Sequence, residues 1–278
     1  MNLIIDIGNT CAKLACFDGY DIVEEQRIDR GEVYLLDKFC SKYNFDRGIL
    51  SSVADVSPEM RQRIDSLPFK MMELVSGKTP VPIEVKYATP LTLGTDRLAA
   101  AVAVAAMQPG SDIMIVDIGT CITFDYVSAK GEYLGGNISL GPSMRFKALH
   151  QFTARLPKVE RRGVVPDIGT TTMTAIRSGV LKGIRYEMEG YINTFVEEHP
   201  SGYIYITGGV HLNPDPEATD DQSRITDFTI GKNEASGRIV HDDYIVPRGL
   251  NCILLYNSQQ ERHESAPTVS TLNSQHCR

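Results

Sequence analysis

The sequence predicts an α/β fold made of two lobes with a cleft between them. The first observation is an internal repeat, because Asp6-Ile7-Gly8-Asn9-Thr10 and Asp117-Ile118-Gly119-Thr120 each follow one apolar run and precede another. The second is that strand-like segments followed by helical segments occur twice along the chain, which is typical of two α/β units. We place the first lobe at residues 1–110, the second at 111–257, and a polar, flexible tail at 258–278.

Each copy of the repeat predicts a β-hairpin with a tight tip. An apolar strand that ends in Asp-x-Gly-Asn/Thr and turns directly into a second strand needs a glycine-containing turn. Glycine lets backbone N–H groups approach a ligand, while the Thr or Asn side chain adds hydrogen bonds and the Asp can hold a cation. One such motif is also typical of an ordinary hairpin. Two that face each other would clamp an anionic, metal-bound group such as the phosphates of ATP.

Hydrophobic periodicity and capping signals predict the elements of the first lobe. The helix after the first hairpin carries Leu35, Leu36 and Phe39 on one face, and the next helix starts at the cap signal Ser57-Pro58. An Ala-rich helix ends at Pro109-Gly110. The expected strands are Leu3–Ile7, Ala12–Phe17 and Gly48–Val53, and the expected helices are Val33–Tyr43, Ser57–Leu67 and Thr95–Met107.

The second lobe restarts the same programme after the lobe boundary near Pro109 to Asp112. We expect its strands at Ile113–Val116, Thr123–Val127, Tyr133–Ile138 and Tyr203–Thr207, and its helices at Met144–Thr153 and Thr172–Glu198.

Composition restricts the class of partner. The chain of 278 residues has 42% apolar and 23% charged residues, which is ordinary for a globular soluble protein. Its net charge of −7 disfavours nucleic acid as a partner, although backbone dipoles still allow small anionic ligands. The 6 cysteines form no Cys-x-x-Cys pair, and four of them lie in apolar stretches, so we expect reduced thiols and a cytoplasmic protein. No signal peptide or membrane span is expected, and hence no membrane partner.

Six motifs in order carry a family resemblance. They are Asp6-Ile7-Gly8-Asn9-Thr10, Gly94-Thr95-Asp96-Arg97, Asp117-Ile118-Gly119-Thr120, Gly135-Gly136-Asn137-Ile138, Thr153-Ala154-Arg155-Leu156-Pro157 and Thr207-Gly208-Gly209. From Met1 to about Tyr256 the chain closely resembles the type III pantothenate kinases of the acetate and sugar kinase/Hsp70/actin superfamily. The resemblance implies two RNase H-like (actin-like ATPase) lobes and a homodimer. It also implies ATP-dependent phosphorylation of pantothenate, the first step of coenzyme A synthesis.

The resemblance also implies roles for individual residues. The catalytic base falls on Asp96, and a monovalent cation, potassium or ammonium, falls on Asp117. ATP, used with Mg²⁺, falls on Asp6, Ile7, Gly8, Asn9, Thr10, Cys11, Ala12, Lys13 and Thr120. The substrate contacts fall on Tyr87, Gly94, Thr95, Asp96, Arg97 and Thr172. The chain departs from the family where Ser139-Leu140-Gly141-Pro142 replaces the usual Pro-Gly, which leaves the path of this loop open.

The chemistry of phosphoryl transfer gives these residue types a purpose. A hydroxyl that attacks a γ-phosphate needs alignment, neutralised charge and an acceptor for its proton. Asp96 lies in the first helical turn, where the helix dipole favours an ionised carboxylate, although an ordinary helix-start acid has the same signature. Arg97 can pair with the carboxylate of pantothenate, or it can form a surface ion pair of minor energy.

Several assignments stay open at the level of sequence. Lys13 either contacts phosphate or is a solvated strand residue. Asp6 and Asp117 can each orient Mg²⁺ through water, and Asp117 can instead hold the monovalent ion. The Gly208-Gly209 turn either admits adenine or is a plain turn after a strand.

Two alternative functions also remain. One is a kinase for another small hydroxyl substrate, and the other is a nucleotide-binding regulatory protein without turnover. For the homodimer, we expect Thr172 to close the pocket and part of the Ala-rich face Ala99 to Ala106 to pack on a partner. The alternative is that this helix packs wholly within its own lobe.

Overall fold

The computed structural model describes the chain except residues 30, 210–237 and 266–278, and for residues 262–265 it describes the backbone alone. The first part of the chain forms β1 (Asn2–Ile7), β2 (Cys11–Asp18), β3 (Asp21–Asp29), α1 (Val33–Cys40), β4 (Arg47–Ser52), α2 (Pro58–Asp65), β5 (Lys70–Glu73), β6 (Glu84–Val85), the 3-10 turn η1 (Pro90–Thr92) and α3 (Thr95–Met107). The second part forms β7 (Ile113–Ile118), β8 (Cys121–Val127), β9 (Glu132–Leu140), α4 (Pro142–Gln151), α5 (Thr172–Glu198), β10 (Tyr203–Thr207), β11 (Ile239–His241) and α6 (Ile245–Ser265).

The two sheets have one topology. The first has the order β3-β2-β1-β4-β5, and the second has the order β11-β10-β7-β8-β9-β6. In each sheet three consecutive strands pair antiparallel, and two later strands add in parallel on the other side of the first strand. The second sheet therefore repeats the first and adds β6 at its edge. This repetition confirms the α/β fold with two RNase H-like lobes.

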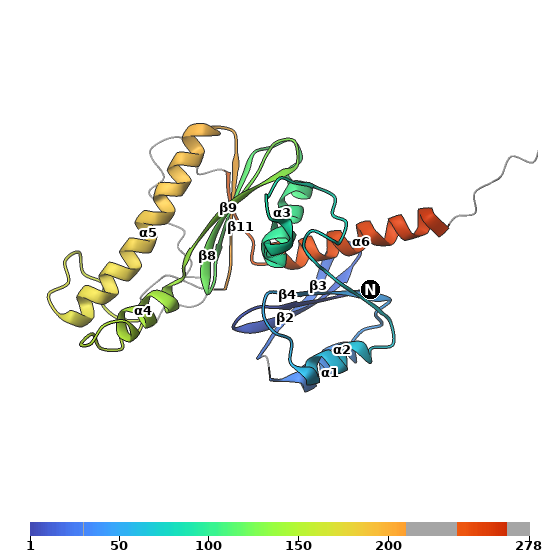
Figure 1. The fold of residues 1–278 in the computed structure, drawn as a ribbon, viewed down its shortest axis with the longest axis horizontal. Coiled ribbons are helices and arrows are strands. Elements are labelled where there is room, and N and C mark those ends of the chain that lie inside the picture. Colours follow the sequence, from blue (N-terminus) through green and yellow to red (C-terminus); the bar gives the residue numbers. More distant parts are fainter. Residues whose placement is uncertain (30, 210–237, 266–278) are drawn as a thin grey trace, which may run out of the picture.

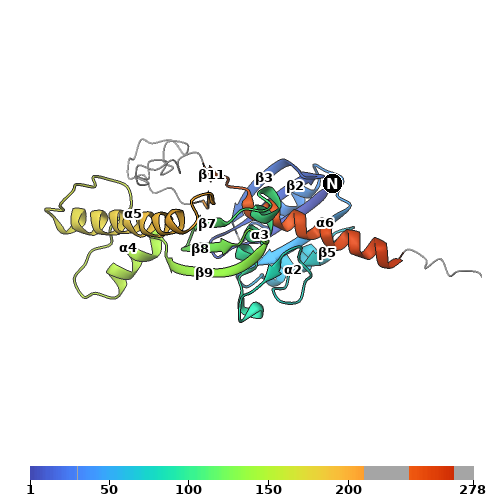
Figure 2. The same cartoon turned by 90° about the horizontal axis from the view of Figure 1, so that it is seen from above.

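Helices α3 and α6 lie between the two sheets, as Figures 1 and 2 show. Helices α1 and α2 cover the outer face of the first sheet, and α4 and α5 lie on the outer side of the second. The central core joins side chains of both sheets to both middle helices, for example Ile4, Ala101, Ile115 and Leu250. The alternation of side chains along β1 follows from this layering, because Ile4 faces α3 and α6 whereas Leu3 and Ile5 face α1 and α2.

The Ala-rich helix α3 is buried by its own chain. Its residues from Leu98 to Val104 are all buried, and they pack chiefly against α6. Gly249 of α6 touches the backbone of Ala99 so closely that a Cβ there would overlap it. Small residues let two helix backbones approach in this way. The expectation that the face Ala99 to Ala106 packs on a partner is therefore wrong for its buried part.

The polar strands and the last helix were not expected from the sequence. Strand β3 has few apolar residues, so the periodicity of a half-buried strand is weak there. Helix α6 continues to Ser265, and Lys70 forms an ion pair with Glu261. The prediction of a flexible tail from residue 258 is therefore wrong for residues 258–265, which belong to α6, while residues 266–278 lie outside the described part. The division at residues 110 and 111 stays a prediction, although β6 of the first part pairs with β9 of the second.

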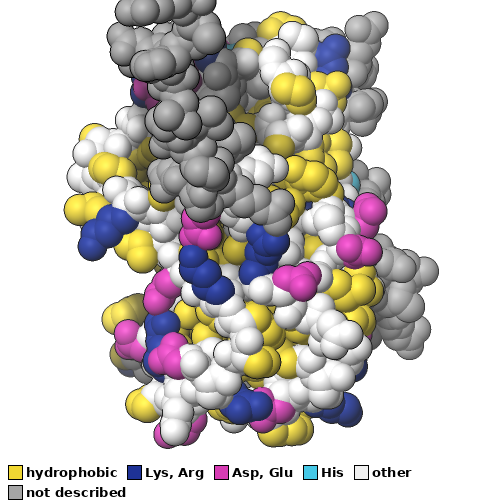
Figure 3. Space-filling view, turned by 90° about the vertical axis from the view of Figure 1, so that its right-hand side faces the viewer, with side chains coloured by type: hydrophobic (Ala, Val, Ile, Leu, Met, Phe, Trp, Pro, Cys, Tyr) yellow, Lys and Arg dark blue, Asp and Glu magenta, His cyan; other side chains and the backbone are white. Residues whose placement is uncertain are grey.

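The surface mixes charges of both signs. On the face in Figure 3, basic and acidic side chains are interspersed among apolar and other polar ones. Among the described helices, none combines the length and the apolarity needed to cross a bilayer. The described cysteines are free thiols, namely Cys11, Cys16, Cys40, Cys121 and Cys252.

Candidate active site

The tips of the two repeated hairpins meet. The Gly8 amide donates to the Cys11 carbonyl at 3.0 Å, and the Gly119 amide donates to the Cys121 carbonyl at 2.9 Å, so both tips close in the same way. The hydroxyls of Thr10 and Thr120 lie 3.1 Å apart and share a hydrogen bond. Two segments separated by more than a hundred residues thus form one exposed double tip, as the repeat predicted.

Behind the first tip, polar side chains form a row across the sheet. Asp6 is paired with Lys13 on β2 and with Ser51 on β4, and paired residues project from the same face. The Ser51 hydroxyl donates to Asp6 Oδ1 at 3.0 Å and lies 3.0 Å from Thr95 Oγ1. The hydroxyl chain connects the first hairpin to the start of α3. Ser51 was not predicted as a site residue, because a Ser at the end of an apolar strand gives no distinctive signal.

The predicted base lies in the first turn of α3. Gly94 is the residue that precedes the helix, and Asp96 is its acidic residue in the first turn. One carboxylate oxygen, Asp96 Oδ1, accepts a hydrogen bond from the Arg97 amide at 2.8 Å. An added Cβ on Gly94 would lie 2.5 Å from that oxygen, so any larger residue would require the carboxylate to move. The Gly94-Thr95-Asp96-Arg97 motif therefore holds the carboxylate in one place.

Four carboxylates gather around this point. Burial raises the pKa of Asp6 from 3.8 to about 6, and nearby Asp96 adds to the rise while Lys13 and Ser51 oppose it. Burial likewise raises the pKa of Asp117 from 3.8 to about 6, opposed by Lys13. Burial is also the main cause that raises the pKa of Asp96, and Asp125 contributes repulsion. The carboxylates of this cluster thus repel one another, and a bound cation would reduce that repulsion.

Asp6→Asn is expected to stabilise the unliganded protein at neutral pH. A carboxyl whose pKa rises on folding binds more protons folded than unfolded, so stability falls as pH increases from about 4 to about 6. The amide of Asn cannot ionise, so the free energy of unfolding should rise by ~1–3 kcal/mol above pH 6. This increase should vanish below pH 4, where the Asp6 carboxyl is protonated in both states. Thermal unfolding at pH 4 and pH 7.5 measures it, with the exposed Asp21→Asn as control. A melting temperature unchanged at both pH values would contradict the prediction.

Arg97 forms a buried ion pair within the protein. Its Nε and Nη2 donate to Asp125 Oδ1 at 2.9 and 2.6 Å, and both residues are buried. The Tyr133 hydroxyl donates to the same oxygen at 2.7 Å, and the Tyr87 ring lies 5.9 Å from the guanidinium. Burial alone would lower the pKa of Arg97, but the hydrogen bonds and charge of Asp125 hold it above its ordinary value. The surface ion pair considered above is therefore wrong, since this pair is buried.

Asp125 was missed, although the sequence carried a signal. It is an acid inside the apolar strand β8, and a buried carboxylate in such a place requires a partner. Gly136 belongs to the Gly135-Gly136-Asn137-Ile138 motif, and a Cβ on it would lie 2.6 Å from Asp125 Oδ1. The motif thus makes space for the Arg97–Asp125 pair.

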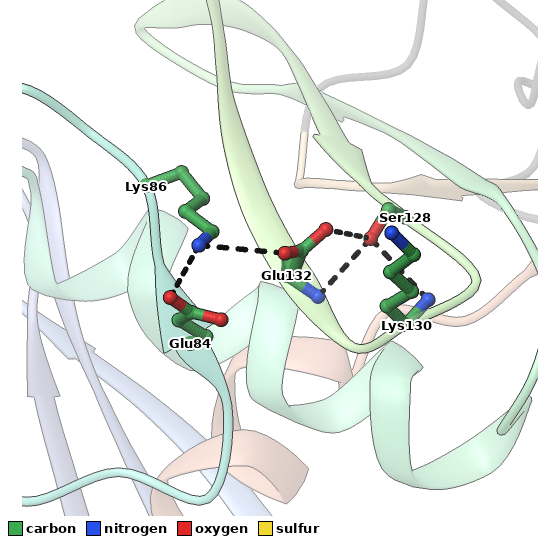
Figure 4. A network of polar contacts seen from close by, with 5 residues as sticks. All are labelled: Glu84, Lys86, Ser128, Lys130 and Glu132. Atoms are coloured by element: carbon green, nitrogen blue, oxygen red, sulfur yellow. Dashed lines mark hydrogen bonds and ion pairs between the residues drawn. The ribbon is translucent and has the colours of Figure 1, made fainter.

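A polar network fixes the segment that carries Tyr87. Figure 4 shows Lys86 between Glu84 of β6 and Glu132 of β9, with the Lys86–Glu132 distance at 3.5 Å. Glu132 in turn accepts from the Ser128 hydroxyl at 3.0 Å. The network joins the edge strand β6 to the second sheet. It thereby holds Tyr87, two residues after β6, beside Arg97.

Gly141 defines the loop that departs from the family pattern. Strand β9 runs to Leu140, the Gly141 amide donates to the Thr120 carbonyl at 3.0 Å, and α4 starts at Pro142. A Cβ on Gly141 would overlap the backbone of Gly119 and Thr120. The loop therefore supports the second hairpin tip from behind.

Thr172 is not brought to the other predicted residues. It is the first residue of α5, is exposed, and follows the capping residue Thr171. The N-terminal end of α5 points away from the first lobe in both ribbon views (Figures 1 and 2). The ionisable residues Asp6, Lys13, Asp96 and Asp117, by contrast, act on one another electrostatically.

A polar cavity adjoins the start of α3. It has a volume of about 790 Å³ and extends from Asn9 to Thr95, past the ends of β4 and β5. In the described part of the chain, no three His, Cys, Asp or Glu side chains are arranged to hold a metal ion. Asp6 and Asp117 thus fit as single oxygen ligands, with water and phosphate completing the shell of Mg²⁺ or a larger monovalent ion.

Comparisons with known proteins show the family of this chain. A family model described as type III pantothenate kinase matches residues 2–194. The chain belongs to the type III pantothenate kinase family. A relative named type III pantothenate kinase from Phocaeicola vulgatus is 44% identical over 93% of this chain and 100% of its own length. One from Bacteroides fragilis is 43% identical over 93% of this chain and 99% of its own length.

Solved structures extend the likeness of fold beyond the type III pantothenate kinase family. A conserved candidate Baf family transcriptional activator from Campylobacter jejuni aligns with a TM-score of 0.55 at 21% identity, covering 92% of this chain and 99% of that one. A candidate 2-dehydro-3-deoxygalactonokinase from Sinorhizobium meliloti aligns with a TM-score of 0.50 at 12% identity, with the same coverage. At these identities the likeness shows the fold alone.

Proposed function

We propose that this chain is a cytoplasmic enzyme that transfers the γ-phosphate of ATP to pantothenate, giving 4′-phosphopantothenate for coenzyme A synthesis. The observation that carries the proposal is the placement of Asp96. Its carboxylate lies in the first turn of α3 and repels those of Asp6 and Asp117, which lie next to the ends of β1 and β7 behind the two joined hairpin tips. A proton acceptor and a phosphate clamp therefore adjoin, which is the arrangement that phosphoryl transfer to a hydroxyl requires.

In this proposal Asp96 takes the proton from the attacking hydroxyl. A raised pKa suits that role, since a base works best when its pKa approaches the working pH. Backbone amides of the hairpin tips and the hydroxyls of Thr10 and Thr120 face the phosphates of the nucleotide, and Lys13 supplies positive charge beside Asp6 and Asp117. Mg²⁺ supplies further neutralisation when bound. We assign the segment from Asp6 through Lys13 to ATP binding, as the sequence predicted.

The role of Arg97 in substrate binding takes a particular form here. Because Asp125 occupies Nε and one N–H of Nη2, the Nη1 group and the second N–H of Nη2 are left to meet the pantothenate carboxylate. Tyr87 and Gly94 flank the same region.

A coupled ADP-release assay, run with and without pantothenate, tests the function. ADP release that depends on pantothenate supports the proposal. ADP release only with another alcohol would favour a kinase for a different substrate. Nucleotide binding without any ADP release would favour a regulatory protein.

Turnover is expected to require potassium or ammonium. Asp117 lies in a cluster of carboxylates with few cations nearby, so a monovalent cation beside it would lower the repulsion between the carboxylates. Such an ion loses its bound water at less cost than Mg²⁺ does. Replacing potassium with sodium or lithium should slow turnover, and Asp117→Ala should be slow in every salt. Equal rates of the unsubstituted enzyme in potassium and sodium at constant ionic strength would contradict this role.

The enzyme is expected to be a C2 homodimer in which Thr172 closes the pantothenate pocket of the partner subunit. The N-terminal end of α5 points away from its own first lobe, and the chain between the end of α4 and the start of α5 carries exposed apolar side chains, namely Phe152, Val164, Ile168 and Met173. Exposed apolar residues gathered in one region favour a protein contact. Light scattering over a dilution series measures the mass. A species of 30.7 kDa that still phosphorylates pantothenate would defeat the shared pocket.

A further inference from the structure

Arg27 extends the polar row of the first sheet beyond Lys13. The register pairs Asp6 with Lys13 and Lys13 with Arg27, so the three side chains project from one face of β1, β2 and β3. Strand spacing places the Arg27 backbone about 10 Å from that of Asp6. The row therefore runs from a carboxylate at the phosphate clamp to two cations in succession.

The guanidinium of Arg27 reaches the second lobe. A Cβ on Gly209 would lie 2.5 Å from Arg27 Nη1 and 3.0 Å from Nη2, so the guanidinium rests on this glycine. The preceding residue, Gly208, packs equally closely on Asp117 and Ile118 of the second hairpin. Arg27 thus spans from an outer strand of the first lobe to the turn that covers the second hairpin of the other lobe.

Among the described residues, this cation has only one weak partner. In the described part of the chain, the guanidinium of Arg27 donates no hydrogen bond, and its ion pair with Glu25 is long at 3.9 Å. Its side chain keeps 44% of its surface exposed. By contrast, Arg97 donates hydrogen bonds to Asp125 from two of its nitrogens. An arginine with free donors, held beside a nucleotide clamp rich in carboxylates, is suited to bind a phosphate in two-pronged fashion.

We propose that Arg27 binds a non-transferred phosphate of the nucleotide and, through its contact with Gly209, ties the first lobe to the second when the nucleotide is bound. The inference rests on the proposed kinase function. A contact to a phosphate that does not move is equally strong before and during transfer, so it contributes to the KM for ATP and leaves kcat largely unchanged.

The test is a kinetic and binding comparison of Arg27→Ala with the unsubstituted enzyme. Loss of a charge-assisted contact should raise the KM for ATP about 10-fold or more, with kcat and the KM for pantothenate within about twofold. Arg27→Lys should recover part of the loss. The control is Arg63→Ala on α2, whose side chain is 43% exposed and lies on the opposite side of the sheet. An unchanged KM for ATP would overturn the proposal.

Binding of ADP and adenosine separates a phosphate contact from a base contact. Calorimetry should show weaker ADP binding to Arg27→Ala and unaltered adenosine binding. An equal loss for adenosine would overturn the assignment to phosphate. If the unsubstituted enzyme binds ADP but does not phosphorylate pantothenate, the proposed function fails while this inference is still decided by the ADP data.

Gly209→Ala tests the contact between the lobes. The added methyl would displace the guanidinium of Arg27, and the backbone of Gly209 does not lie in the left-handed region that only glycine favours. The KM for ATP should rise in Gly209→Ala but rise little further when the change is added to Arg27→Ala. Equal effects in both backgrounds would show that the methyl acts without Arg27, which would overturn the tie between the lobes.

Discussion

Asp96→Asn is expected to fold normally and to lose turnover by a factor of ~10²–10⁴, the usual contribution of a positioned general base. The amide has the same shape and can still accept the Arg97 amide at its oxygen, so the start of α3 should not move. It cannot take a proton from the attacking hydroxyl. Because burial raises the pKa of Asp96, the neutral amide should also leave the melting temperature unchanged or slightly higher.

The measurement is kcat at saturating ATP and pantothenate, together with nucleotide affinity by calorimetry. Asp65→Asn, an exposed acid at the end of α2, is the matched control and should behave as the unsubstituted enzyme. The unsubstituted enzyme should lose activity as pH falls, at a higher pH than an ordinary carboxyl implies, because the carboxylates of the cluster titrate together. A near-normal kcat in Asp96→Asn would show that another group takes the proton.

Asp125→Ala is expected to destabilise the fold by ~3–5 kcal/mol, because it leaves a buried charge without a partner. Asp125 accepts hydrogen bonds from Arg97 and Tyr133, and all three side chains are buried. The substitution leaves both the Arg97 guanidinium and the Tyr133 hydroxyl without their hydrogen-bond acceptor. Since Arg97 follows Asp96 directly on α3, the residual folded protein should also bind pantothenate poorly.

Chemical denaturation measures this loss, and a double substitution supplies its control. Arg97→Met with Asp125→Leu removes both charges and keeps apolar volume, so it should be clearly more stable than Asp125→Ala while remaining inactive. If the single and double variants unfold at the same denaturant concentration, the penalty does not come from the unpaired guanidinium.

The sequence predicted the fold to the extent that local signals are strong. The helices Thr95–Met107 and Thr172–Glu198 and the strand Tyr203–Thr207 have the predicted bounds, because each is bounded by a capping residue or by a nearby Gly or Pro. The polar strand β3 was missed, since its pairing with β2 rather than its own apolar pattern makes it a strand. The short strands β6 and β11 exist for the same reason.

By itself, the sequence determined the repeat, and the repeat determined the two hairpins and the two lobes. An Asp-x-Gly motif between apolar runs folds locally, so its form is legible in a single segment. The motifs also carried the family, because a catalytic acid between Thr95 and Arg97 is recognised by its neighbours in the chain.

Tertiary structure alone decided which of these residues face one another. The register between strands, rather than distance along the chain, aligns Asp6 with Lys13 and Arg27 and sets the Thr10 hydroxyl against that of Thr120. The same holds for Arg97, whose partner Asp125 lies on a strand of the other lobe. A buried charged side chain pairs with the opposite charge that the fold packs beside it. Which residues are packed together depends on the whole folded chain, so a local sequence pattern does not show it.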